Sequence, residues 1–144
     1  MNNNSFPKIS VIVPCYNYGR FLEQCLNSIL LQSIDDFEIV VINDCSADET
    51  KEVMEQFVSN PKIKIIHHAH NIGFPKTVNE GVRIARGKYI AMVSADDYLI
   101  NKSALYILSN FIDTHNEVGF VHSAQYFSDG NRNILYSIYR RDKI

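Results

Sequence analysis

Phe37-Glu-Ile-Val-Val-Ile42 is the stretch that decides the fold, because its last four residues are all aliphatic and β-branched. A strand that apolar is covered on both faces, as the strands of parallel sheets are. Asn43-Asp-Cys-Ser46 follows at once, and Ser46-Ala-Asp-Glu49 has the spacing of a capping box, which starts a helix. A buried strand that leads directly into a helix is the unit of an α/β fold.

The same alternation continues on both sides of this stretch. β-branched or apolar runs predict further strands at residues 9–14, 63–67 and 88–93. Apolar residues at helical spacing predict helices at residues 20–31, 46–59 and 75–85, and a fourth helix that Asn101 caps. In the third of these helices, the residues expected to face inward are Val78, Val82 and Ala85.

The end of the chain is expected to form a hairpin. Residues 118–127 and 134–139 have strand composition and flank Ser128-Asp-Gly-Asn131, in which Asp-Gly is a hairpin signal. The whole order, βαβαβαβαββ, predicts a three-layer α/β/α sandwich with a mainly parallel sheet and right-handed crossovers. We expect residues 1–144 to form a single domain.

Length and composition agree with one soluble domain. Of 144 residues, 46% are hydrophobic and 21% are charged, which excludes disordered, collagen-like and disulfide-scaffold chains. The longest aliphatic run, residues 39–42, is far shorter than the roughly 20 residues of a membrane helix, and residues 1–6 lack the apolar core of a signal peptide. Three cysteines without Cys-x-x-Cys spacing predict neither a disulfide framework nor a zinc site. We expect a cytoplasmic protein.

Charge is distributed unevenly along the chain. The net charge is −2, yet residues 130–144 hold only one acid, Asp142, against the basic residues Arg132, Arg140, Arg141 and Lys143. Such an end can contact phosphate or a membrane surface, and a plain solvated end is the alternative. The aromatic residues have no basic residues interleaved, so the sequence does not favour nucleic acid as a partner.

Polar residues follow each of the four predicted parallel strands. They are Pro14-Cys-Tyr-Asn17, Asn43-Asp-Cys-Ser46, His70-Asn-Ile-Gly73 and Ser94-Ala-Asp-Asp97. In open α/β sheets, ligands bind beyond the carboxyl ends of the strands, near a switch in strand order. Because all four clusters fall on that edge, we predict a ligand site there.

The positions of the glycines and acids indicate how this site would bind phosphate. The chain has no G-x-G-x-x-G after the first strand and no P-loop, since Gly87-Lys88 is followed by Tyr89. Asp96 and Asp97 supply hard oxygen ligands of the kind that Mg²⁺ or Mn²⁺ takes when it also binds substrate phosphates. The sequence therefore favours a metal clamp on phosphates.

Each acid also has a structural explanation. Asp96 and Asp97 can cap the following turn, and Asp44 can begin an Asx turn. Asp48 suits the first turn of a helix through the helix dipole, and Ser46 and Glu49 are expected to cap rather than catalyse. His67-His-Ala-His70 has no third ligand nearby, and nothing orients Cys15 toward a histidine, so we expect structural roles for these residues.

Taken in order, these motifs closely resemble those of the family 2 glycosyltransferases of the GT-A fold. The matching segments are Ser10-Val-Ile-Val-Pro-Cys-Tyr-Asn17, Glu38-Ile-Val-Val-Ile-Asn-Asp-Cys-Ser-Ala-Asp48, Asn71-Ile-Gly73, Asn79-Glu-Gly81, Gly87-Lys-Tyr-Ile90 and Ser94-Ala-Asp-Asp97. The resemblance covers about residues 8–100. It implies a metal-dependent, inverting, hexosyltransferase-type transfer from a nucleotide-diphosphate-sugar, with a UDP-sugar favoured, to a glycan, lipid-linked or other hydroxyl acceptor.

The resemblance also implies roles for individual residues. Pro14, Tyr16 and Asn17 resemble the loop that frames the nucleoside, Asp44 the acid that hydrogen-bonds the base, and Asp48 a second acidic position. Asn71 and Gly73 fall in the segment that closes over the donor. Ser94, Ala95 and Asp96 match the D-x-D motif, in which the last Asp contacts metal and diphosphate, and Asp97 matches the acid that follows it. Residues implied to hold Mg²⁺ or Mn²⁺ are Asp96 and Asp97.

Two positions depart from the family pattern, since Cys45 stands where Gly is usual and Ser94 where the first Asp of D-x-D is usual. No family motif matches a general base at Asp113, Glu117 or Asp129, so the base is expected beyond residue 144. The resemblance then divides the domain into a nucleotide-sugar and metal-binding half, residues 8–100, and a helix plus hairpin leading toward the acceptor half, residues 101–144, with the C-terminal part of the GT-A fold missing.

Such enzymes serve polysaccharide biosynthesis and the cell envelope, which extends the expected location to peripheral contact at the inner face of the membrane. Two alternatives stay open on sequence grounds. One is a folded nucleotide-binding domain without turnover. The other is a nucleotidyltransferase, although the expected Gly-rich phosphate loop is missing from residues 14–19.

Overall fold

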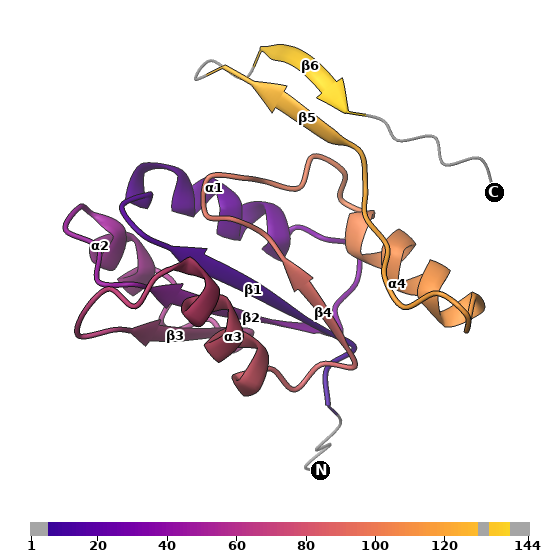
Figure 1. Cartoon of the computed structure of the whole chain (residues 1–144), viewed down its shortest axis with the longest axis horizontal. Helices are drawn as coiled ribbons and strands as arrows, with labels where there is room; N and C mark the ends of the chain where they lie inside the picture. The colour runs from indigo at the N-terminus through magenta and orange to yellow at the C-terminus, as the bar shows by residue number, and fades with distance from the viewer. Residues whose placement is uncertain (1–5, 130–132, 139–144) are drawn as a thin grey trace.

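We describe a computed structural model of the chain over residues 6–129 and 133–138 (Figure 1). Strands and helices alternate in the predicted order. The strands are β1 (Ile9–Cys15), β2 (Phe37–Asn43), β3 (Ile63–His67), β4 (Tyr89–Met92), β5 (Gln125–Ser128) and β6 (Ile134–Ile138). The helices are α1 (Gly19–Leu30), α2 (Thr50–Glu55), α3 (Phe74–Ile84) and α4 (Ala104–Thr114).

The central sheet has the strand order β3-β2-β1-β4, and its three strand pairs are parallel. The chain builds outward from β1 through β2 to β3 and then crosses to the other side of β1 to add β4. The strand order therefore reverses between β1 and β4, which is the switch point where open α/β sheets bind ligands. The predicted mainly parallel α/β sheet is confirmed.

Helices cover both faces of this sheet, as the predicted three layers require (Figure 1). The larger core joins one face of β1 and β2 to α1, α2 and α4 through buried side chains that include Val11, Leu26, Met54 and Leu105. The smaller core lies on the α3 face and contains Ile12, Val40 and Ile42. Both faces of β1 and β2 are buried, which explains their unbroken aliphatic sequences.

Helix α2 begins later than the capping-box spacing predicts, and the box does not form. The Ser46 hydroxyl oxygen accepts the backbone N–H of Asn17 at 2.9 Å. The backbone N–H of Thr50 donates instead to Asp48 Oδ1 at 3.1 Å, and the helix spans only Thr50–Glu55. A contact with the neighbouring loop therefore outcompetes the local cap.

Helix α3 is only partly buried through the predicted residues: Val78 and Ala85 are partly buried and Ala85 packs against the smaller core, but Val82 is exposed. Its buried residues are Thr77 and Gly81, whereas Val82 is 44% exposed. A Cβ on Gly81 would lie 2.5 Å from Ile12 Cγ2. The missing side chain lets the helix backbone approach the sheet, and this close approach overrides the apolar spacing that the prediction used.

The last part of the chain forms an antiparallel hairpin of β5 and β6, which pairs with no strand of the central sheet in the part of the chain described. Residues 118–124 were expected in the first strand but have no strand partner there, so only Gln125–Ser128 is extended in a ladder. Gly130 and Asn131 of the predicted turn lie outside the described residues, as do the four basic residues near the C-terminus. No helix in residues 6–129 or 133–138 is long and apolar enough to cross a bilayer.

Candidate functional site

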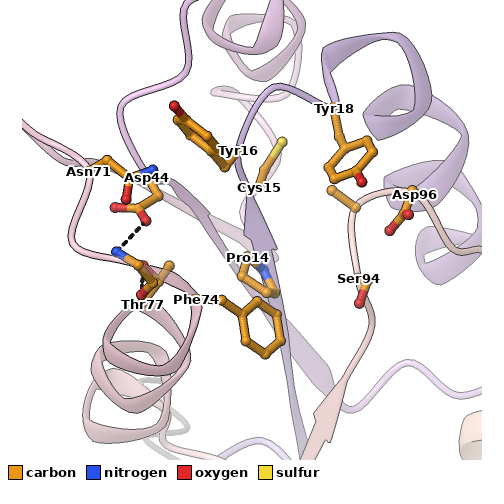
Figure 2. Close-up of a pocket in the computed structure, with 12 residues that line it drawn as sticks. Pro14, Cys15, Tyr16, Tyr18, Asp44, Asn71, Phe74, Thr77, Ser94 and Asp96 are labelled. Carbon is orange, nitrogen blue, oxygen red and sulfur yellow. Dashed lines mark hydrogen bonds between the residues drawn. The ribbon is translucent and has the colours of Figure 1, made fainter.

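A pocket of about 510 Å³ lies at the carboxyl ends of β1, β2 and β4, next to the switch in strand order (Figure 2). This size suits a nucleotide-sized ligand. Eight of the ten residues predicted to bind nucleotide-sugar line it, namely Pro14, Tyr16, Asp44, Asn71, Gly73, Ser94, Ala95 and Asp96. The topology therefore brings together residues that lie up to 82 positions apart in the sequence.

The other two predicted residues, Asn17 and Asp48, do not line the pocket, and their side chains bind backbone. Asn17 Oδ1 accepts the N–H of Ala47 at 2.8 Å. Asp48 Oδ2 accepts the N–H of Gly19 at 2.9 Å. Burial would raise the pKa of Asp48, but hydrogen bonds from the Thr50 hydroxyl and from the N–H groups of Gly19 and Thr50 outweigh burial and lower it. Both residues join the loop after β1 to the loop after β2. Their contact with nucleotide stays a prediction.

Asp44 lies at the end of β2 and is only 3% exposed. Its Oδ1 accepts the backbone N–H of Ile72 at 2.9 Å, and its Oδ2 accepts that of Gly73 at 2.9 Å. Burial alone would raise the pKa of Asp44, but hydrogen bonds from His68 and these two amides lower it. Asp44 is therefore held ionised at the pocket wall. Asp44 does not form the Asx turn that the sequence allowed; in this loop it is Asn43 Oδ1 that accepts a local N–H, that of Ser46, at 2.8 Å.

His68 was expected to be structural, and its pairing with Asp44 was not predicted. Its Nδ1 lies 2.8 Å from Asp44 Oδ1 and its Nε2 lies 3.1 Å from Glu80 Oε2. The sequence signal was position alone, because His68 directly follows β3 on the same rim as the other polar clusters. The partners of its ring become visible only when β3 and α3 are placed beside β2.

Asp96 and Asp97 lie in the turn after β4, where the backbone N–H of Asp97 donates to the Ser94 carbonyl oxygen at 2.9 Å. Their carboxylates cap nothing within residues 6–129 and 133–138, in contrast to the capping alternative. Desolvation and the neighbouring Asp96 charge raise the pKa of Asp97, so a cation would relieve the repulsion between the two acids. Asp96 lines the pocket and Asp97 does not.

The carboxylates of Asp96 and Asp97 fit a hard divalent cation whose other ligands come from substrate phosphates and water. In the described ranges, no group of three or more His, Cys, Asp or Glu side chains is placed to hold a metal. Mg²⁺ is commonly held by one or two carboxylates together with substrate phosphates and waters. Two free carboxylates beside a pocket meet that requirement only when a phosphate ligand is present.

Four further residues line the pocket and were not predicted: Cys15, Tyr18, Phe74 and Thr77. Three aromatic rings, those of Tyr16, Tyr18 and Phe74, are between 41% and 53% exposed and give the pocket apolar walls. Figure 2 shows Tyr16 on the Asp44 side, Tyr18 on the Asp96 side and Phe74 beside Pro14. Burial raises the pKa of the Cys15 thiol, which agrees with its expected structural role.

The comparisons with known proteins agree with this geometry. A family model described as glycosyl transferase family 2 matches residues 10–142. The uncharacterized glycosyltransferase EpsJ of Bacillus subtilis is 40% identical over 94 residues, which are 65% of this chain. Poly(ribitol-phosphate) beta-N-acetylglucosaminyltransferase TarS of Staphylococcus aureus is 38% identical over 112 residues, which are 76% of this chain.

Solved structures agree in fold. The crystal structure of a TarS segment in complex with UDP-GlcNAc matches 76% of this chain with a TM-score of 0.70. A mannosyltransferase from Pyrobaculum calidifontis, solved with GDP-Man and Mn²⁺, matches with a TM-score of 0.69 at 23% identity. The expected GT-A fold is confirmed. The chain spans 27% of the length of EpsJ, 19% of TarS and 33% of the mannosyltransferase chain.

Proposed function

This chain belongs to glycosyl transferase family 2, and on that premise we propose that it binds the nucleotide-diphosphate-sugar donor of a glycosyl transfer, with a UDP-sugar favoured. One observation carries the proposal. A single pocket holds a buried, ionised carboxylate, Asp44, toward one end and an uncommitted carboxylate, Asp96, toward the other. Such a pair suits a ligand with a hydrogen-bond donor at one end and a metal-bound diphosphate at the other.

The Asp44 end is proposed to bind the nucleoside. A carboxylate offers about four acceptor positions, and His68, Ile72 and Gly73 occupy three of those on Asp44. The Thr77 hydroxyl also interacts with this carboxylate and lowers its pKa, so a ligand N–H such as that of a uracil ring would bind Asp44 beside Thr77 or in its place. Tyr16 and Asn71 lie on the same side of the pocket, and an aromatic ring there offers a face on which a base can stack (Figure 2).

The Asp96 end is proposed to hold the diphosphate. Asp96, with Asp97 next to it, would ligate Mg²⁺ or Mn²⁺ together with the phosphate oxygens. When bound, such an ion would stabilise the charge that develops on the diphosphate leaving group. Ser94 stands where the family has a further acid, so its hydroxyl is proposed to reach the ion through water or to contact the ribose.

The reaction is proposed to invert the configuration of the transferred sugar. An acceptor hydroxyl would attack the anomeric carbon from the face opposite the diphosphate, and a general base would take its proton. The prediction that this base follows residue 144 stays a prediction, as do the roles of residues 8–100 and 101–144 as donor-binding and acceptor-facing halves. A glycan or lipid-linked acceptor of the cell envelope is proposed, with peripheral contact at the inner face of a membrane. TarS, a poly(ribitol-phosphate) beta-N-acetylglucosaminyltransferase, supports a polymer acceptor.

Saturation-transfer NMR with UDP, GDP and dTDP, each in Mg²⁺, tests the donor proposal. We expect the strongest signal from UDP and a marked loss in Asp44→Asn. The matched control is Asp36→Asn, which neutralises an exposed acid outside the pocket. Equal signals from all three nucleotides, or none from any, would contradict the proposal.

Turnover is measured separately. Release of UDP from a UDP-sugar supports a transferase, whereas binding without release supports a nucleotide-binding domain alone. A nucleotidyltransferase would instead release pyrophosphate from UTP and a sugar phosphate, and that result would refute the proposed reaction.

A further inference from the structure

The His68 imidazole lies between two carboxylates that come from different elements. Its two ring nitrogens lie 2.8 Å from Asp44 Oδ1 and 3.1 Å from Glu80 Oε2. The His68 side chain is 9% exposed, and that of Glu80 is 35% exposed. The ring therefore links the end of β2 to the middle of α3 from a largely buried position.

Both contacts are hydrogen bonds when both ring nitrogens carry a proton, because a carboxylate only accepts. In that form, His68 also offsets the charges of Asp44 and Glu80. The two acids would otherwise face each other across the ring with no described cation between them. Because Asp44 is ionised, its hydrogen bond to a proton on His68 Nδ1 is charge-assisted, and such a bond is stronger than one between neutral groups.

Asp44 passes this restraint on to the loop that precedes α3. The backbone N–H groups of Ile72 and Gly73 each donate to one oxygen of Asp44, at 2.9 Å in both cases. Asn71, Gly73 and Phe74 line the pocket on that side. The orientation of the Asp44 carboxylate thus affects both the position of this loop and the oxygen that a ligand would meet in the pocket. The hydrogen bond to His68 restrains that orientation in addition to the two backbone amides.

We propose that His68, held in place by Glu80, is a positioning residue that orients the Asp44 carboxylate and the loop of residues 69–73 for nucleoside binding. The inference rests on the proposed function, since it assumes that a nucleoside meets Asp44. His68 does not line the pocket, so its effect on a ligand passes through Asp44. The pairing is a property of this chain's own residues, since it needs a histidine after β3 and an acid in the middle of α3.

Three variants separate positioning from general structural support. His68→Ala removes both hydrogen bonds. His68→Asn keeps an amide donor near the position of Nδ1, and so keeps the Asp44 contact while losing the one to Glu80. His70→Ala is the matched control, because His70 lies in the same loop with an exposed side chain.

Amide hydrogen exchange, followed by NMR without nucleotide, reports on the loop itself. We expect the Ile72 and Gly73 amides to exchange about tenfold faster in His68→Ala, as loss of a charged hydrogen bond predicts. His68→Asn should restore most of the protection, and His70→Ala should leave it unchanged. Unchanged exchange in His68→Ala would overturn the inference whether or not the chain binds UDP.

Calorimetric titration with UDP in Mn²⁺ reports on recognition. We expect about tenfold weaker binding in His68→Ala and near-parental binding in His68→Asn. Equal UDP affinity in the parent and His68→Ala would overturn the inference and leave the proposed function standing. If the parent does not bind UDP, the proposed function fails and nucleoside positioning fails with it, whereas the exchange data still decide whether His68 holds the loop.

Discussion

Gly19 is the point at which the loops after β1 and β2 meet, and Gly19→Ala tests that contact. A Cβ at this position would lie 2.6 Å from the backbone nitrogen of Thr50 and 2.9 Å from the carbonyl carbon of Glu49. Ordinary contacts begin near 3.4 Å, so α1 and α2 must separate by about 0.8 Å. Both of these neighbours are backbone atoms, and a side-chain rotation cannot relieve the clash.

The expected cost follows from two losses and one gain. Overpacking of this kind costs about 1–3 kcal/mol. Separation of the loops also weakens the hydrogen bond from the Gly19 N–H to Asp48 Oδ2, and a hydrogen bond to a charged group contributes about 1.5 kcal/mol. Alanine recovers up to about 1 kcal/mol of helix propensity at the start of α1. We expect a net loss of about 2 kcal/mol in the free energy of unfolding, or a Tm lower by about 4–8 °C.

Urea and thermal unfolding followed by far-UV circular dichroism measure this change. Gly119→Ala is the matched control, because a Cβ there meets no atom within 4 Å. We expect Gly19→Ala also to weaken UDP binding, since Tyr16 and Tyr18, which line the pocket, lie on the displaced loop. If Gly19→Ala destabilises the chain no more than Gly119→Ala, the two loops do not depend on each other in the way described.

Two further predictions concern acid and metal. Hydrogen bonds from Ser10 and Arg86 outweigh burial and lower the pKa of Glu38, and the pKa of Asp44 is lowered as well, so the folded state binds fewer protons than the unfolded state. The contribution of these two carboxylates to the free energy of unfolding is then fully present above about pH 4.5 and is lost as the pH falls further. The Tm measured from neutral to acid pH should show this loss, and Glu38→Gln should make the fall in Tm less steep. A Tm independent of pH would contradict the prediction. Mn²⁺ alone should bind weakly, because residues 6–129 and 133–138 place no group of three or more His, Cys, Asp or Glu side chains around a metal, and Asp96 and Asp97 offer two carboxylates. Tight binding of Mn²⁺ without nucleotide by calorimetry would refute this donor set.

The parts of the fold that sequence analysis predicted are those fixed by local patterns. The strand at residues 63–67 is observed with the predicted bounds, and that at residues 37–42 extends by one residue, because β-branched runs leave few alternatives. The edge of the sheet at which the polar clusters meet could also be predicted. Once parallel strands are assigned, topology places the residues after each strand on one edge.

The errors occur where contacts between distant segments decide the outcome. The Ser46 hydroxyl accepts the N–H of Asn17 from the neighbouring loop, and so the predicted capping box does not form. In α3, the close contact of Gly81 with Ile12 decides which residues are most deeply buried. His68 has two partners that lie 24 and 12 residues away along the chain. No local pattern specifies such pairs, so they required the three-dimensional structure.

The site residues divide in the same way. Asp44 could be predicted in the pocket because it directly follows the buried strand β2, and Asp96 because it lies in the loop after β4, on the same edge of the sheet. Asn17 and Asp48 also belong to rim loops, but their oxygens are used by backbone N–H groups of the adjacent loop. Phe74 reaches the pocket from the first turn of α3, where sequence alone predicts a helix start and not the direction of a ring.

The central claim is that the pocket holds a nucleoside diphosphate whose metal-bound end lies at Asp96. Calorimetric titration of UDP into the parent chain and Asp96→Asn, each with and without Mn²⁺, tests it most directly, with uridine as a control that lacks phosphates. We expect Mn²⁺ to strengthen UDP binding to the parent by at least about tenfold, or about 1.4 kcal/mol. The effect of Mn²⁺ should be far smaller in Asp96→Asn, and uridine should bind equally to both. An equal effect of Mn²⁺ on the parent and on Asp96→Asn would contradict it.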